Sequence, residues 1–219
     1  MLIELLFADR VDAGRKLAKY LKRFYQGSCV VMAIPRGGIV VGYEVAKELK
    51  CPLDVVITRK VGAPGQPELA VGAVSEDGTI FIDEEIAAIL GVSKTYVEQK
   101  AEEEKKEIQR RAQIYRRGRP MSPLRGRTVV LVDDGLATGL TMKAAVHMAR
   151  HQGAGKIIVA VPVAPPETVE KLKKIADDVV VLETPTQFFA IGQFYDKFEQ
   201  LEDQEVLNIL TKASAELGI

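Results

Sequence analysis

Two adjacent carboxylates, Asp133 and Asp134, follow a run of apolar residues and precede a loop rich in glycine and hydroxyl side chains. The apolar run, Val129–Val132, is typical of a buried strand, and the loop, Gly135–Thr141, leads into a segment with helical apolar spacing. Open α/β sheets bind their ligands beyond the carboxyl ends of the strands. The two acids are therefore expected at a ligand-binding edge.

The loop carries the groups that hold an anion. Backbone N–H groups of Ala137, Thr138 and Gly139 would point outward at the N-terminus of the following helix, and the hydroxyls of Thr138 and Thr141 add donors. Gly135 and Gly139 let the backbone approach a ligand closely. The acid pair alone could equally hold Mg²⁺ or end the strand of a receiver domain. Because a loop that can bind an anion lies beside it, the acid pair favours a sugar phosphate as ligand. The vicinal hydroxyls of the sugar would then donate hydrogen bonds to the two acids.

This segment resembles the signature by which the phosphoribosyltransferase family binds 5-phosphoribosyl-1-pyrophosphate (PRPP): an apolar strand, an acid pair and an Ala-Thr-Gly-x-Thr loop. The resemblance implies that Asp133 and Asp134 hold the ribose 2- and 3-hydroxyls. It implies that the 5-phosphate lies on Gly135, Ala137, Thr138, Gly139 and Thr141.

A second segment, Val31–Gly38, is an apolar run that ends in Arg36, Gly37 and Gly38. Glycine amides at a strand–helix turn suit oxyanions, and Arg36 adds a cation. Alone, this pattern could be a plain tight turn. By resemblance it matches the family's pyrophosphate loop.

Two cations, Arg59 and Lys60, directly follow the expected strand Leu53–Thr58. They could be a solvated pair, but in the family basic residues at this place contact pyrophosphate. The next residues, Val61–Glu68, resemble the start of the family's flexible active-site loop. The Arg-Lys-Val-Gly-Ala-Pro string is similar to a subgroup known chiefly as predicted phosphoribosyltransferases.

The resemblance implies a glycosyltransferase of nucleotide metabolism that transfers 5-phosphoribose from PRPP to a small nitrogenous base and releases pyrophosphate. Asp134, Arg36 and Lys60 would carry catalysis, which rests on positioning and electrostatics. Mg²⁺ would be bound through the pyrophosphate of PRPP, because no set of protein carboxylates looks like a dedicated metal site. A non-catalytic PRPP-binding regulatory protein of the same fold is the alternative.

The acceptor base stays unassigned. In enzymes of the family that act on 6-oxopurines, the position of Ala137 is usually an acid, which makes hypoxanthine, guanine and xanthine less favoured. Aromatic residues gather in 188–198, where they could simply form core. The family places a variable hood there, and Phe194 and Tyr195 are the expected contacts of the base.

The pattern along the chain predicts one α/β domain over residues 1–219 with a doubly wound parallel sheet and a hairpin and helix insertion at about 62–126. The resemblance implies that the sheet is phosphoribosyltransferase-like, that the insertion is flexible and that a small C-terminal hood lies at about 184–200. The insertion would contain a hairpin turning at 76–78 and a long polar helix, roughly Ser93–Arg117, which could cover an edge, act as a lid or make a dimer contact. The expected strands are Cys29–Ile34, Leu53–Thr58, Thr128–Val132, Ile157–Val161 and Val179–Leu182, and a terminal helix is expected over Asp203–Leu217.

The composition is that of an ordinary globular protein. The chain has 219 residues with 30 basic and 30 acidic side chains, so its formal net charge is zero. A protein that coats nucleic acid would be strongly basic, so nucleic acid is not an expected partner, although the stretch Arg110–Arg127 is rich in arginine and could attract a polyanion or be a plain surface loop. A homodimer is expected, as is common in the family.

The location in the cell is expected to be cytoplasmic. The first sixteen residues lack the features of a signal peptide, and no apolar stretch is long enough to span a membrane. Cys29 and Cys51 form no metal-binding pattern with the two histidines, so they are predicted to be two reduced thiols in the core.

Overall fold

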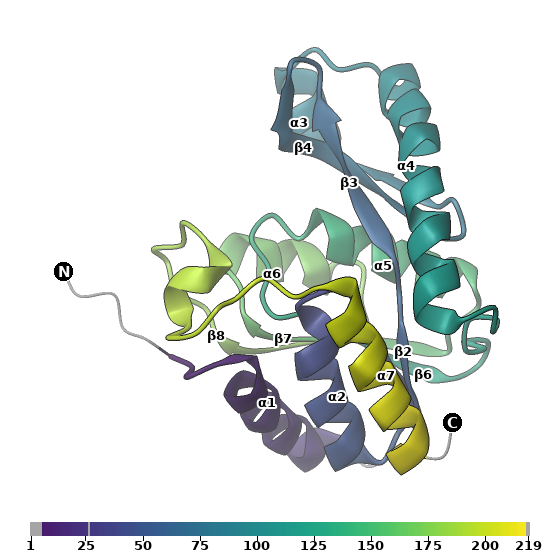
Figure 1. Cartoon of the computed structure of the whole chain (residues 1–219). Helices are drawn as coiled ribbons and strands as arrows, with labels where there is room; N and C mark the ends of the chain where they lie inside the picture. The colour runs from purple at the N-terminus through teal and green to yellow at the C-terminus, as the bar shows by residue number, and fades with distance from the viewer. Residues whose placement is uncertain (1–5, 26, 218–219) are drawn as a thin grey trace.

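The computed structural model describes residues 6–25 and 27–217. Residues 1–5, part of the N-terminal stretch interpreted above, lie outside it, as do Gln26 and the last two residues. A parallel sheet forms the centre of the described chain, with strand order β2-β1-β6-β7-β8 (Figure 1). Its strands are β1 (Cys29–Ala33), β2 (Leu53–Val55), β6 (Thr128–Val132), β7 (Lys156–Val163) and β8 (Asp178–Glu183). The predicted α/β parallel sheet is confirmed.

Helices cover both faces of this sheet because successive side chains of each strand point to opposite faces. Val31 and Val130 belong to one buried cluster, which includes residues of α1 (Arg10–Phe24), α2 (Gly38–Leu49) and α7 (Asp203–Leu217). Val30 and Val129 belong to a second cluster, with α5 (Leu140–His151) and α6 (Pro166–Lys173). This explains why the strands are apolar without interruption.

The long connection between β2 and β6 forms an arm that projects from the sheet (Figure 1). The predicted hairpin is present, and its turn holds Asp77 against Ser75 and Thr79. Residues 61–68 are part of a further hairpin and not a simple loop. The strand Thr58–Ala63 pairs antiparallel with the strand Gln66–Ser75, which is also the first strand of the predicted hairpin. The elements of the arm are β3 (Thr58–Ala63), β4 (Gln66–Ser75), β5 (Ile80–Ile82), α3 (Glu84–Ile89) and α4 (Lys94–Arg116).

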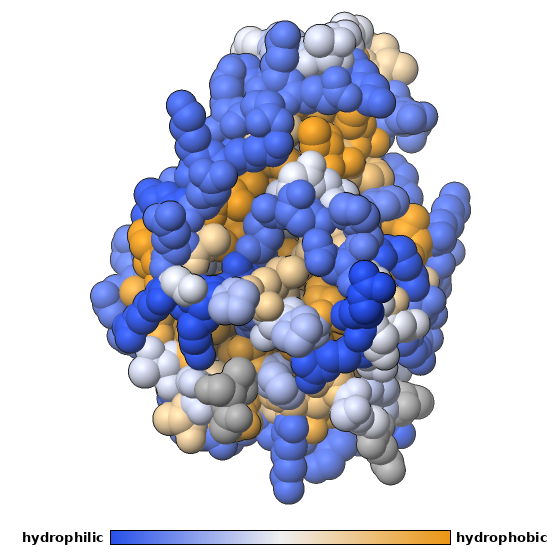
Figure 2. Space-filling view, turned by 90° about the vertical axis from the view of Figure 1, so that its right-hand side faces the viewer, coloured by the Kyte–Doolittle hydropathy of each residue, from blue (hydrophilic) through white to orange (hydrophobic). Residues whose placement is uncertain are grey.

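The long helix α4 covers one face of the arm's sheet. Ser93 caps it by accepting a hydrogen bond from Tyr96 N, and a narrow stripe that includes Val97, Ala101 and Ile108 is buried. Figure 2 shows one face of the molecule, on which hydrophilic residues cover much of the surface and apolar patches lie between them. Within the arginine-rich stretch, Arg116 is buried and paired with Asp54 and Glu76. Part of that positive charge is therefore neutralised inside the fold.

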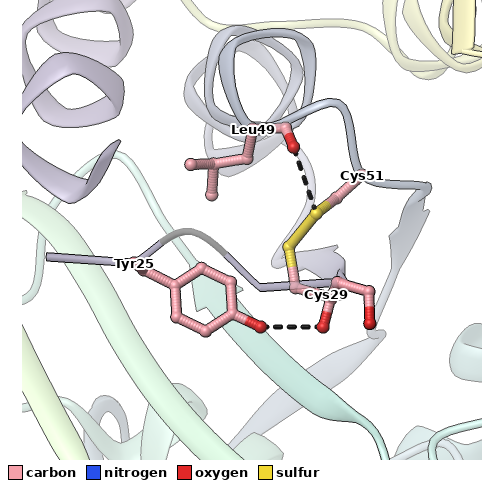
Figure 3. The surroundings of a disulfide bond; sticks show 5 residues. Tyr25, Cys29, Leu49 and Cys51 are labelled. Carbon is pink, nitrogen blue, oxygen red and sulfur yellow. Dashed lines mark hydrogen bonds between the residues drawn. A yellow bond between two sulfur atoms is a disulfide. The ribbon is translucent and has the colours of Figure 1, made fainter. Parts of the chain in front are cut away.

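The prediction of two reduced thiols is wrong, because Cys29 and Cys51 form a disulfide with a Cα–Cα distance of 5.5 Å (Figure 3). The register of the sheet explains the pairing. Val31 lies opposite Leu53, an offset of 22 residues, and the same offset places Cys51 beside Cys29. The sequence spacing alone did not show this, since the offset depends on the length of the α2 crossover.

No helix of the described chain is both long enough and apolar enough to cross a bilayer.

Candidate functional site

The two predicted ligand loops meet at the carboxyl edge of the sheet. β1 and β6 are neighbours, with Ala33 opposite Val132, so the residues that follow them lie side by side. A Cβ atom placed on Gly37 would lie 1.8 Å from Asp134 Oδ2, and one on Gly38 would lie 2.9 Å from Asp133 Cα. No side chain fits at either glycine. Glycine is required there by contact with the acid pair.

Each of the two carboxylates has one oxygen engaged by the protein. Asp133 Oδ1 accepts from Asp134 N at 2.8 Å, and Asp134 Oδ2 accepts from Arg10 Nε at 2.7 Å. No other N–H or hydroxyl group of the described residues donates a hydrogen bond to either carboxylate. Two neighbouring acceptors of this kind match a vicinal diol.

The charge of the pair is uneven. Burial, and then the adjacent charge of Asp134, raise the pKa of Asp133 well above its usual value, and Lys60 acts against this rise. Asp134 is buried and holds its ion pair with Arg10, whose side chain is also nearly enclosed. The edge therefore contains one carboxylate held by a cation and one whose ionisation is opposed.

The loop after the acids is fixed by its neighbours. Gly139 has φ 72°, the left-handed region that favours glycine, and it precedes the first residue of α5. Thr168 of α6 donates to Ala137 O at 2.6 Å, and Leu136 N donates to Val163 O at 2.9 Å. Ala137 and Thr138 are exposed. The amides at the start of α5 are thus held rigidly at the surface, where they can bind a phosphate.

The structure separates the three predicted cations. Arg59 lies on the same face of β3 as Val61, whose side chain packs toward α4. The Nε of Arg59 pairs with Glu104 at 2.7 Å. Lys60 points to the opposite face and lies near enough to Asp133 to influence its titration. Arg36 is partly exposed, follows a cis peptide bond to Pro35, and approaches Glu202 at 4.0 Å. Lys60 is therefore on the side of the acid pair and Arg59 is not.

Arg10 is a site residue that the sequence reasoning missed. It begins α1, donates from Nε to Asp134 and from its terminal nitrogen to Glu199 O at 2.7 Å, and lies 3.8 Å above the Phe198 ring. The contact to Asp134 spans 124 positions of the chain. No local motif marks it.

The hood also differs in detail from expectation. Phe194 and Tyr195 are each only 4% exposed and pack with Phe7, and the Tyr195 hydroxyl donates to Asp134 O at 2.5 Å. Their rings are core residues of the hood, as the simpler interpretation had it, and they present no face to a base. In contrast, Phe189 is 84% exposed.

Phe188 and Phe189 line a cavity of about 340 Å³ beside the loop after the acids. Ala137 and Thr138 of this loop form one side of the cavity, and Asp83 of the arm lines another side. The cavity is large enough for a heterocycle and opens next to the expected phosphate site.

The described residues contain no group of three or more histidine, cysteine, aspartate or glutamate side chains arranged to hold a metal ion. The carboxylates that face the site are Asp133 and Asp134, and each already has one oxygen engaged. This donor set suits a metal that arrives with most of its oxygen ligands on the substrate.

Comparison with known proteins agrees with this geometry. A family model described as the phosphoribosyl transferase domain matches residues 8–199. A protein of Mycobacterium tuberculosis named "Putative phosphoribosyl transferase", found in strains H37Rv and CDC 1551, is 46% identical over 208 residues, which is 95% of this chain. The match covers 47% of that protein, so the chain spans about half the length of these curated relatives.

A solved structure is also similar over nearly its whole length. The crystal structure of TT1426 from Thermus thermophilus has 44% sequence identity and a TM-score of 0.80, and the match covers 94% of this chain and 98% of that one. The chain belongs to the phosphoribosyl transferase domain family. The resemblance inferred from Asp133 to Thr141 is confirmed.

Proposed function

We propose that this protein is a phosphoribosyltransferase that transfers 5-phosphoribose from PRPP to a small nitrogenous base. The observation that carries the proposal is the contact between two loops: Gly37 and Gly38 pack directly against Asp133 and Asp134. A pyrophosphate-binding loop, a diol-binding acid pair and a phosphate-binding helix start then share one edge. PRPP combines a pyrophosphate, a vicinal diol and a phosphate in one molecule.

The residues divide the substrate among them. Asp133 and Asp134 accept hydrogen bonds from the ribose hydroxyls, and the loop Gly135–Thr141, in which Ala137 and Thr138 are exposed, holds the 5-phosphate. Arg36, the amides of Gly37 and Gly38, and Lys60 face the charge that develops on the leaving pyrophosphate. The bond from ribose C1 to the pyrophosphate oxygen breaks as the bond from C1 to the base nitrogen forms, and the proton carried by that nitrogen is released to solvent.

Magnesium enters this proposal as part of the substrate. It would neutralise charge on the pyrophosphate, and the carboxyl groups of Asp134 and Asp133 lie against Gly37 and Gly38, close enough to this loop to help orient the complex. Arg59 has no role in this account, since its side chain is paired with Glu104 on the other face.

The acceptor is proposed to bind in the cavity beside Ala137. Phe189 offers an exposed aromatic face for stacking, and the side chain of Ala137 adds neither charge nor hydrogen-bonding capacity. Phe194 and Tyr195 support this wall from behind, because Phe194 packs on Phe188 with ring centroids 5.0 Å apart.

The test is release of pyrophosphate from PRPP and Mg²⁺ in the presence of a panel of purine and pyrimidine bases. We expect at least one base to support turnover, and Asp134→Asn and Arg36→Ala to lose most of it, about 100-fold each. Lys174→Ala at the exposed end of α6 is a control that should turn over normally. Near-normal turnover in both site variants would refute the assignment. Binding of PRPP without turnover on any base would identify a regulatory PRPP-binding protein instead.

A further inference from the structure

Arg10 contacts three groups from separate parts of the chain, and one of them is a carboxylate of the acid pair. Its Nε donates to Asp134 Oδ2 at 2.7 Å, and its side chain is only 11% exposed. It also donates to Glu199 O, and its guanidinium stacks on Phe198. One side chain of α1 thus joins the end of β6 to the end of the hood.

The contact determines which oxygen of Asp134 is available. A Cβ on Gly37 would lie 1.8 Å from Asp134 Oδ2 and 3.0 Å from Arg10 Nε, so the backbone at Gly37 closes over the ion pair. The carboxylate is clamped between this backbone and Arg10, and Tyr195 anchors the carbonyl of the same residue from the hood. The remaining oxygen, Oδ1, is the one left for a ligand hydroxyl.

The charge of Arg10 also counters a local repulsion. Asp133 and Asp134 are adjacent acids at an enclosed edge, and an unpaired second carboxylate would be costly there. Arg10 supplies a cation for Asp134, whereas Lys60 lies on the side of Asp133. The two acids therefore have separate cationic partners on separate elements.

We propose that Arg10 is a positioning residue for the ribose diol: it fixes Asp134 through one oxygen and so aims the other at the substrate hydroxyl. This inference rests on the proposed function, since it assumes that the acid pair binds the ribose of PRPP. Arg10 touches Asp134 and the hood, and its effect on the ligand is indirect.

The experiment compares two ligands that differ in the ribose. Binding of Mg²⁺–PRPP and of Mg²⁺–pyrophosphate is measured by calorimetry for the wild type, Arg10→Gln and Arg10→Lys, with thermal unfolding recorded for each. Arg10→Gln is expected to weaken PRPP binding by about 10- to 100-fold, the effect of losing a charge-assisted hydrogen bond, and to leave pyrophosphate binding within about 2-fold. Arg10→Lys keeps the charge but cannot bind Asp134 and Glu199 O at the same time. Its PRPP affinity should therefore lie between those of the wild type and Arg10→Gln.

Arg15→Gln is the matched control, because Arg15 is on the same helix and pairs with Glu44 away from the acid pair. It should bind both ligands as the wild type does. Equal loss of PRPP and pyrophosphate binding in Arg10→Gln would overturn the proposal, since that pattern indicates a general structural role. Unchanged PRPP binding would also overturn it.

If Arg10→Gln fails to fold, Arg10→Lys decides, and PRPP affinity equal to that of the wild type would refute the inference. A wild-type protein that binds pyrophosphate but not PRPP would refute the proposed function itself, and the role of Arg10 would fall with it.

Discussion

Replacing Gly37 with alanine tests the contact between the two loops directly. The backbone at Gly37 has φ −60° and ψ −42°, which any residue adopts, so the substitution adds no backbone strain. The added methyl would start 1.8 Å from Asp134 Oδ2 and 2.6 Å from its Cγ. Since the carboxylate also pairs with Arg10, it must leave that partner, or the loop must move away from it.

The magnitude follows from what is lost. Displacing Asp134 from Arg10 breaks a charge-assisted hydrogen bond, worth about 1.5–3 kcal/mol, and overpacking costs about 1–3 kcal/mol of stability. The first figure corresponds to a loss of PRPP affinity of roughly 10- to 150-fold. Calorimetric titration with Mg²⁺–PRPP measures the affinity, and urea unfolding measures the stability.

Gly91→Ala is the control for a change in stability without a change in the site. Gly91 has φ 65°, and no atom lies within 4 Å of the place where an added methyl would stand, so alanine there adds backbone strain alone. It should destabilise the protein and bind PRPP normally. A folded Gly37→Ala protein with PRPP affinity within about 2-fold of the wild type would show that the two loops do not act together.

Three further changes test the electrostatics and the disulfide. Asp133→Asn should raise the melting temperature at neutral pH and weaken PRPP binding. Because the pKa of Asp133 is raised in the folded protein, the stability of the wild type falls as the pH rises above the usual aspartate pKa. The gain in melting temperature should therefore vanish near pH 4, and a gain that persists there would contradict this cause. Burial opposes ionisation of Asp77, but hydrogen bonds from Thr79 and neighbouring groups outweigh this effect and lower the pKa of Asp77 to about 2. Asp77→Asn should therefore lower the free energy of unfolding by roughly 2 kcal/mol at pH 7. This loss should shrink as the pH falls toward 2, which urea unfolding at a series of acidic pH values would show. Cys51→Ser should lose about 3 kcal/mol in urea under oxidising conditions and match the wild type in reductant, whereas equal stability in both conditions would exclude a stabilising disulfide.

Much of the sheet and of the ligand edge could be predicted from local sequence. The strand Thr128–Val132 and the terminal helix Asp203–Leu217 have the predicted bounds, because unbroken apolar runs and regular helical spacing are local signals. The acid pair and its loop were recognisable for the same reason: a strand end, two acids and a helix start follow each other directly in the chain.

The remaining features depend on contacts between distant segments. Arg10 reaches Asp134 across 124 positions, and the pairing of Cys29 with Cys51 follows from the register of β1 on β2. Arg59 and Lys60 look equivalent in sequence, but strand alternation sends them to opposite faces of β3. The aromatic residues of the hood were visible, but which rings are buried depends on how the hood packs against Phe7.

The most direct test of the account is titration of the wild type and Asp134→Asn with Mg²⁺–PRPP. The geometry predicts one PRPP bound per chain by the wild type, and a loss of affinity of about 100-fold when the carboxylate becomes an amide. Absence of PRPP binding by the wild type, or equal affinity of the two proteins, would contradict the claim that this edge of the sheet binds PRPP.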